Sequence, residues 1–253
     1  MIDDLVEYVV AVPGRELLLL APRDSDALLS EEAFKKEEFL PYWAELWPSS
    51  VALARVVARR PLKGRRTIEL GCGLGLPAIV AAAAGGRVLA TDWSPDAVAI
   101  TARNAERNGV ALETGLFQWD AAPERLGPPW PLVLASDVLY EVRNVDPLLE
   151  LLPRLTDTAG EVWLADPGRP PGARFFERAA ERWRIDAIPH DGPEHVTVHR
   201  LRRNSDSQVR LPRSTNALRR ASDLAASRSA VCATNTRPAI RPRNPPGFVY
   251  SLR

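Results

Sequence analysis

A glycine-rich turn constrains this chain more than any other feature of its sequence. Gly71, Gly73 and Gly75 alternate directly after the strand-like segment 67–70 and directly before an alanine-rich, helix-like segment. Pro77 stands near the start of that helix, where proline is favoured. Such glycines let the backbone approach a ligand between the carboxyl end of a strand and the amino end of a helix. The turn therefore predicts a nucleotide-binding type of α/β fold.

The first two hundred residues continue this alternation of strands and helices. Strands are predicted at 67–70, 87–91, 113–117, 131–135, 161–165, 183–188 and 195–201, helices at 51–59, 77–84, 95–107, 145–155 and 174–181, and a two-stranded hairpin within 5–20. This order predicts a Rossmann-like, mostly parallel sheet of seven strands with helices on both faces. The last two strands have no helix between them, so we expect an antiparallel hairpin at the C-terminal edge.

The charge distribution divides the chain near residue 203. Residues 204–253 carry nine arginines, no lysine and two acidic residues, a net charge of +7, whereas residues 1–203 carry −6. The tail has few large apolar residues and no periodicity, so it cannot offset the entropy of ordering. We predict one domain over residues 1–203 and a basic, disordered tail over 204–253. A basic tail can also contact nucleic acid, but a solvated tail is the simpler interpretation.

The sequence gives little indication of a membrane-spanning segment, a metal site or a disulfide bond. The longest apolar stretch, near 74–84, is shorter than the ~20 residues of a membrane span, and the acidic segment 1–4 is unlike a signal peptide. Cys72 and Cys232 match no disulfide or zinc-ligand spacing, and the three histidines have no ligand partners nearby. We therefore expect a cytoplasmic protein without membrane or metal partners.

The details of the glycine turn distinguish between cofactors. A dinucleotide-binding turn usually has glycine at its sixth position, where this chain has Leu76. S-adenosylmethionine (SAM) has no diphosphate, so the shorter G-x-G-x-G form suits it better, and Glu69 can attract its cationic methionine end. Asp92 ends the next strand, 21 residues after Gly71, where a carboxylate can accept both ribose hydroxyls. A simple helix-entry turn at Asp92 is the alternative.

Two later strand ends carry further candidates. Trp119 can pack on an adenine ring and Asp120 can accept from its exocyclic amine, although an exposed turn is the competing interpretation. Asp137 and Tyr140 follow the fourth strand and share one face if that segment is helical. Asp137 can then orient an incoming amine, and Tyr140 can line the channel through which that amine enters. Alternatively, Asp137 caps a turn and Tyr140 packs in the core.

Three motifs in this order resemble the family-16 lysine methyltransferase-like group of seven-β-strand enzymes, which includes bacterial relatives labelled nicotinamide-N-methylase-like. They are PYWAELWPSS at 41–50, ELGCGLG at 69–75 and ASDVLY at 135–140. The glycine turn is generic to SAM enzymes, whereas the W-P pair and the D-x-x-Y element narrow the resemblance. It covers residues 5–203 and does not extend to the tail.

The resemblance implies a SAM-dependent N-methyltransferase. It implies cofactor contacts from Trp47, Gly71, Cys72, Gly73, Asp92, Trp119 and Ser136, with Asp137 and Tyr140 beside the methyl acceptor. A protein lysine is the predicted acceptor, and the acidic body suits a basic partner. The alternatives are a small-molecule amine such as a nitrogen heterocycle, a non-catalytic binding module, and a nucleotide-dependent oxidoreductase, which Leu76 disfavours. Segment 166–169 can border the same mouth, but a plain turn is the preferred interpretation.

Overall fold

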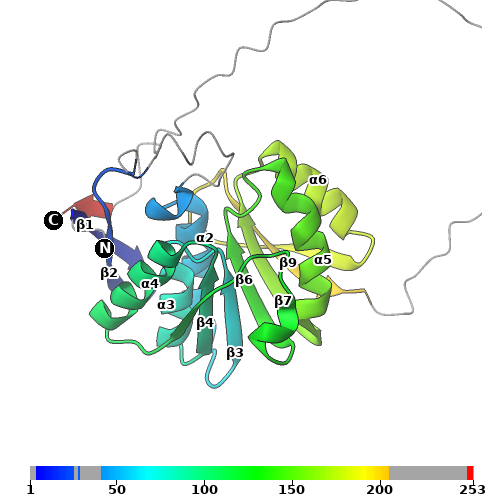
Figure 1. The fold of residues 1–253 in the computed structure, drawn as a ribbon, viewed down its shortest axis with the longest axis horizontal. Helices are drawn as coiled ribbons and strands as arrows, with labels where there is room; N and C mark the ends of the chain where they lie inside the picture. Colours follow the sequence, from blue (N-terminus) through cyan, green and yellow to red (C-terminus); the bar gives the residue numbers. More distant parts are fainter. Residues whose placement is uncertain (1–3, 26–27, 29–40, 205–249, 253) are drawn as a thin grey trace, which may run out of the picture.

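A seven-stranded sheet forms the centre of this computed structural model, in which residues 4–25, 28, 41–204 and 250–252 are described (Figure 1). The strands lie in the order β5-β4-β3-β6-β7-β9-β8. Their bounds are β3 Arg66–Leu70, β4 Arg87–Asp92, β5 Glu113–Leu116, β6 Trp130–Ser136, β7 Thr156–Asp166, β8 Trp183–Ile188 and β9 Thr197–Arg203. The strands from β5 to β7 run parallel, and β9 is antiparallel to both β7 and β8. The predicted mixed sheet with an antiparallel edge is confirmed.

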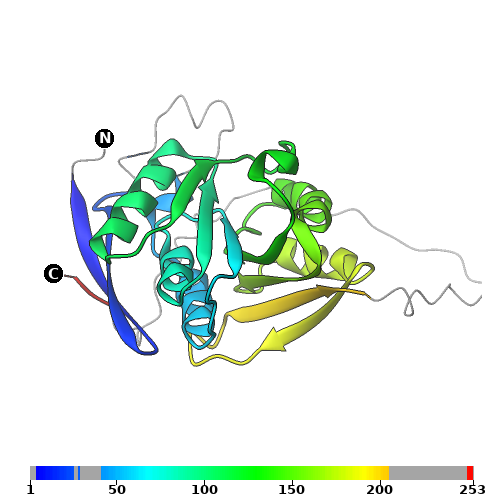
Figure 2. The ribbon, with the colours of Figure 1, turned by 90° about the horizontal axis from the view of Figure 1, so that it is seen from below.

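Helices cover both faces of this sheet, because side chains along each strand alternate between two cores. On β6, Leu132 and Leu134 belong to one core, and Val133 and Ala135 belong to the other. Helices α2 (Pro48–Ala58), α3 (Leu76–Ala83) and α4 (Pro95–Arg107) contribute to the first core, and α5 (Val145–Leu155) and α6 (Pro170–Ala179) to the second. Figure 2 shows helices on both sides of the sheet.

The connections of the sheet reverse direction between β3 and β6. From β3 the chain builds β4 and then β5 on one side, and it returns to build β6 on the other side of β3. At such a switch point the loops after the two central strands diverge and leave a crevice at their carboxyl ends. Gly71 follows β3 and Ser136 ends β6, so both predicted site residues lie at this crevice.

Several boundaries differ from those predicted, for local reasons. Helix α6 begins at Pro170 rather than near residue 174, because proline fits the first turn of a helix. Strand β7 begins at Thr156, directly after α5, and its register against β6 shifts between Trp130 and Leu132. No helix of the described residues is both long and apolar enough to cross a membrane.

A smaller sheet lies beside α4. Strands β1 (Leu5–Val12) and β2 (Arg15–Pro22) form the predicted hairpin, drawn in dark blue at one end of Figure 1. Strand β10 (Tyr250–Leu252) pairs antiparallel with β1. This strand was not predicted, because the whole tail was expected to be disordered. The rest of that prediction concerns 205–249 and 253, which lie outside the described residues.

Asn104 of α4 and Asn108, the C-terminal cap of that helix, join the hairpin to α4 and to the glycine turn. Asn104 accepts from the Leu20 amide at 2.8 Å and donates to the carbonyl oxygens of Leu20 and Leu74, each at 3.0 Å. One helical turn later, Asn108 accepts from the Leu18 amide at 2.9 Å and donates to its carbonyl oxygen at 2.8 Å. Asn104 is fully buried, and Leu74 belongs to the glycine turn. One amide group therefore connects the hairpin, α4 and the turn.

Replacing Asn104 by alanine is expected to lower the free energy of unfolding by about 2–3 kcal/mol, because the buried Leu74 carbonyl and the part-buried backbone groups of Leu20 lose their partners. The matched variant Asn108→Ala should cost only about 1 kcal/mol, since water can replace a half-buried amide. Urea unfolding followed by circular dichroism measures both changes. Equal losses in the two variants would contradict the connecting role of Asn104.

Candidate functional site

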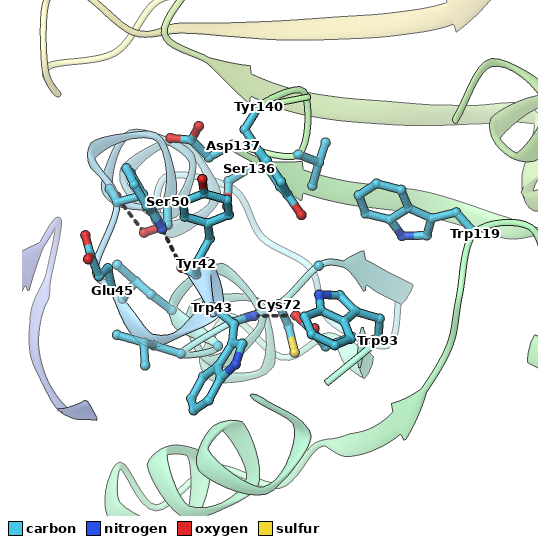
Figure 3. A pocket seen from close by; sticks show the side chains of 18 of the residues that line it. Tyr42, Trp43, Glu45, Ser50, Cys72, Trp93, Trp119, Ser136, Asp137 and Tyr140 are labelled. Atoms are coloured by element: carbon cyan, nitrogen blue, oxygen red, sulfur yellow. Dashed lines mark hydrogen bonds between the residues drawn. The ribbon is translucent and has the colours of Figure 1, made fainter. Parts of the chain in front are cut away.

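A cavity of about 460 Å³ opens at the switch point of the sheet. It is walled by segment 42–50, by the glycine turn, by residues that follow β4, β5 and β6, and by the start of α6. Nine of the eleven predicted site residues line it, namely Trp47, Gly71, Cys72, Gly73, Asp92, Trp119, Ser136, Asp137 and Tyr140. Glu69 and Asp120 do not. Figure 3 shows Tyr42, Asp137 and Tyr140 at one end of the cavity and Trp93 and Trp119 at the other.

The glycine turn presents bare backbone to the cavity. All three glycines have positive φ, +65° at Gly71, +53° at Gly73 and +83° at Gly75. A Cβ at Gly73 would lie 3.1 Å from the Trp43 carbonyl oxygen, and one at Gly71 would lie 3.1 Å from Val138 Cγ1. A side chain at either position would be strained and would fill space beside the cavity. The turn is therefore a cradle that can admit a ligand closely.

Glu69, for which a contact with a ligand was predicted, does not line the cavity. Its side chain lies on the α3 side of β3, where Oε2 accepts a hydrogen bond from the Ala78 amide at 2.8 Å. A carboxylate at a helix N-terminus satisfies an unpaired amide and complements the helix dipole. Complete burial raises the pKa of Glu69 well above its ordinary value. The acid before the turn thus fixes α3, and it positions the glycine turn without lining the cavity.

Asp92 connects the glycine turn to the end of β4. Its carboxylate is 3% exposed, and it accepts from the Gly73 amide through Oδ2 and from the Ser94 amide through Oδ1, each at 3.0 Å. A carboxylate has about four acceptor positions, so acceptor capacity remains beside these bonds. Burial raises the pKa of Asp92, and backbone hydrogen bonds with Ser94, Gly73 and Trp93 oppose this rise. The carboxylate can therefore hold the turn and accept two vicinal hydroxyls together.

The far end of the cavity is aromatic. Trp93 and Trp119 line both the main cavity and an adjoining one of about 190 Å³. Asp120 is exposed and lines only the adjoining cavity, so the structure separates it from the space that the other predicted residues share. Cys72 is a buried free thiol in the glycine turn. Burial raises its pKa well above the ordinary value, which makes it an inert wall rather than a nucleophile.

Asp137 has an unusual backbone conformation. Its φ is +56°, the only positive value at a non-glycine position among the described residues. Its amide donates to the Ala165 carbonyl oxygen at 2.9 Å, which extends the β6–β7 pairing by one residue before the chain turns. Aspartate tolerates this left-handed conformation better than most residues. Segment 137–141 is not helical, so the condition under which Asp137 and Tyr140 were expected to share one helical face is not met, although both line the cavity.

Tyr140 is held in an aromatic cluster at the acceptor end. Its ring meets the Tyr42 ring edge-on with centroids 5.0 Å apart, and the Tyr42 ring meets Trp47 at 6.1 Å. The Trp47 indole N–H donates to the Tyr42 carbonyl oxygen at 2.7 Å, and Pro48 begins α2 directly afterwards. Burial raises the pKa of Tyr140 above its ordinary value, although hydrogen bonding with Asn144 opposes the rise. The phenol therefore stays protonated and serves as a wall or hydrogen-bond donor.

Arg169 is a cavity residue that the preferred sequence interpretation missed. The turn itself is as expected, with Gly168 at φ +82° and its amide donating to the buried Asp166 at 2.7 Å. Arg169 then caps α6, and its guanidinium pairs with the Asp137 carboxylate and lies over the Trp47 ring, 5.6 Å from the centroid. Burial lowers the pKa of Arg169 from its ordinary value. The segment after β7 thus does border the cavity mouth.

Tyr42, which lies in the PYWAELWPSS motif, and Trp93 are among the other lining residues that were not chosen as site residues. The position of Trp93 directly after Asp92 is the sequence feature that could have identified it as a site residue. No group of three or more possible metal-ligating side chains occurs in the described part of the chain. The cavity therefore combines a buried carboxylate, a bare glycine backbone and aromatic walls, a set that fits a nucleoside joined to a cationic group.

Comparisons with known proteins identify the family. The sequence profile of a family described as lysine methyltransferase matches residues 35–182, more than half of the chain. The electron transfer flavoprotein beta subunit lysine methyltransferase of Danio rerio is 38% identical over 133 residues, 51% of this chain and 51% of that protein. Protein N-lysine methyltransferase METTL21A of Danio rerio is 28% identical over 175 residues, 65% of this chain and 79% of that protein.

The chain spans about half the length of the flavoprotein-subunit methyltransferases that it matches. The crystal structure of TrmN from Thermus thermophilus is similar with a TM-score of 0.50 and 18% sequence identity, covering 61% of this chain and 49% of that one. This likeness concerns the fold alone. The family match confirms the predicted resemblance and SAM as the cofactor. The chain belongs to the lysine methyltransferase family.

Proposed function

We propose that this protein transfers a methyl group from SAM to the side-chain amine of a lysine in a protein substrate. The observation that carries the proposal is the convergence of two sets of residues in one cavity. The glycine turn and Asp92 form one set, suited to a nucleoside, and Asp137 and Tyr140 form the other, suited to an amine. A methyl donor and a methyl acceptor have to meet in one space, since the S–CH3 bond breaks as the N–CH3 bond forms and S-adenosylhomocysteine leaves. A lysine that enters as an ammonium first gives its proton to the Asp137 carboxylate.

The residues of the two sets have distinct roles in this proposal. When bound, SAM supplies an electrophilic methyl group on a sulfonium. Asp92 accepts from the ribose hydroxyls, and the bare backbone at Gly71 and Gly73 admits the rest of the cofactor. Asp137 accepts a hydrogen bond from an N–H of the acceptor amine. Tyr140 lines the path by which the acceptor enters and excludes water from it. Tyr140 stays protonated, so it does not act as the base.

The charge of the protein favours a cationic acceptor. Residues 1–203 carry a net charge of −6, and exposed Glu45 lines the cavity mouth. Such a field raises the local concentration of basic partners. The family match and the two relatives whose names include lysine methyltransferase support a protein lysine. The proposed compartment is the cytoplasm, which agrees with Cys72 being a buried free thiol.

A labelling experiment tests the acceptor class. The protein and tritiated SAM are added to a dialysed lysate of the source cell, and a second sample of that lysate is first treated with acetic anhydride to acylate the lysine amines. Label on a protein band in the untreated sample alone supports lysine transfer. Label that persists after blocking indicates another protein side chain, label only on reintroduced small molecules indicates a small-molecule amine, and no label indicates a binding module.

Asp92→Ala is expected to weaken SAM binding by about 1–3 kcal/mol, roughly 5- to 150-fold in Kd, because two ligand hydroxyls lose a buried acceptor. Isothermal titration calorimetry measures the change. The control Asp96→Ala removes an exposed carboxylate outside the cavity and should leave Kd as in the unaltered protein. Equal affinity in all three proteins would remove Asp92 from the cofactor site.

SAM affinity should also fall as the pH is lowered through the pKa of Asp92. Hydroxyl donors favour the ionised carboxylate, so protonation weakens binding. Burial raises this pKa above its ordinary value of 3.8, so the loss should begin at a higher pH than for an exposed aspartate. Calorimetry at a series of pH values measures it, with Asp92→Asn as the control. The same pH dependence in that variant would assign the effect to another group.

Asp137→Asn is expected to reduce turnover by at least about 100-fold while SAM affinity is retained, because the neutral amide cannot hold a cationic or proton-donating nitrogen as a carboxylate does. Asparagine tolerates positive φ, so the backbone should persist. Steady-state kinetics and calorimetry separate the two effects, and Asp146→Asn, exposed on α5, is the control. A parallel loss of SAM affinity would move Asp137 into the cofactor site.

A further inference from the structure

We infer that Arg169 occupies, in the acceptor-free protein, the place that the acceptor's cation takes beside Asp137, and that the acceptor has to displace it. The inference rests on the proposed function and adds a specificity-determining residue to it. Three observations carry it, namely the contacts of the guanidinium, the composition of the walls around it, and the way in which the side chain is held.

The guanidinium makes the contacts expected of a bound cation. It pairs with the Asp137 carboxylate and lies over the Trp47 ring, 5.6 Å from the centroid. Carboxylates and the faces of aromatic rings are the groups that bind alkylammonium ions in proteins. The rings of Tyr42 and Tyr140 lie next to these groups, and Figure 3 shows both beside Asp137. The same walls therefore suit the ammonium of an incoming side chain.

A counter-ion is needed here whether or not an acceptor is bound. Asp137 is 7% exposed, and an unpaired carboxylate at that depth is costly. Arg169 supplies the missing positive charge from the loop after β7. An acceptor that brings its own charge can replace Arg169 without leaving Asp137 unpaired. A neutral amine or heterocycle cannot, so the exchange selects cationic acceptors.

Arg169 is held in a way that permits its release. Within the described residues, its guanidinium pairs with Asp137, lies over the Trp47 ring and interacts electrostatically with Tyr42. Its side chain is already 28% exposed, and it stands at the cap of α6, after a glycine of positive φ. The guanidinium can therefore rotate into solvent without a change in the sheet or in α6. Because of this competition, the apparent association constant for the acceptor is the intrinsic constant multiplied by the fraction of molecules in which Arg169 has left its place beside Asp137.

The test uses n-butylammonium chloride as a probe, because it requires no methylation. Its binding is followed by NMR through the indole N–H signal of Trp47, in the unaltered protein and in Arg169→Gln. Arg169→Gln should bind the probe about tenfold more tightly, whereas Arg169→Lys, which keeps a competing cation, should resemble the unaltered protein. Arg178 lies on α6, the helix that Arg169 caps, and forms an exposed ion pair with Asp146 of α5, so Arg178→Gln is the matched control. n-Butanol should bind no more tightly to Arg169→Gln than to the unaltered protein.

Steady-state kinetics with a lysine acceptor provide the second measurement. Arg169→Gln should raise kcat/KM through a lower KM. Unchanged or weaker butylammonium binding in a variant with an unaltered melting temperature would overturn the inference, and so would a fall in kcat at constant KM, which indicates a fixed positioning role. If the probe binds more tightly to Arg169→Gln but no protein is methylated, the result supports Arg169 as a displaceable cation and contradicts the proposed function.

Discussion

One buried carboxylate determines how the two halves of the crevice fit together. Asp92 ends β4, yet its oxygens accept from the amides of Gly73, after β3, and Ser94, before α4. Parallel strands end at the same edge of the sheet, but their loops are otherwise independent. Because Asp92 is almost fully buried, these hydrogen bonds form away from competing water. The shape of the turn, and hence any ligand contact with it, depends on this carboxylate.

The fold could be predicted because its pattern is local and repeated. Strands of alternating or continuous apolar residues, proline at helix starts and glycine at turns each have short-range causes. The errors of the prediction concern element boundaries and one pairing between distant segments. Strand β7 and helix α6 began earlier than predicted, and Tyr250–Leu252 forms a strand by pairing with β1, a partner more than two hundred residues away in the sequence. Pairing between such distant segments has no signal within either one.

The site could be predicted in part, and the misses share a cause. A residue's place in the sequence indicates which strand end it follows, but not to which side its chain turns. Glu69 lies on the α3 side of β3 and Asp120 lies beyond Trp119, although the lining residues Gly71 and Trp119 are within two positions of them in the sequence. Arg169 comes from the fifth parallel strand, and its approach to Asp137 depends on the turn at Gly168. The directions of these side chains depend on three-dimensional packing, which the spacing of residues in the sequence does not determine.

The asparagines of α4 also affect how the small sheet can grow. An edge strand with unpaired backbone groups invites another chain to add to it, which is a common route to aggregation. Along β2, the side chains of Asn104 and Asn108 occupy the amides and carbonyls that an added strand would need. Extension is thus blocked on that side, and the opposite edge of the small sheet is β10, which already pairs with residues 8–10 of β1. The helix protects the hairpin from self-association and directs any strand exchange to the opposite edge.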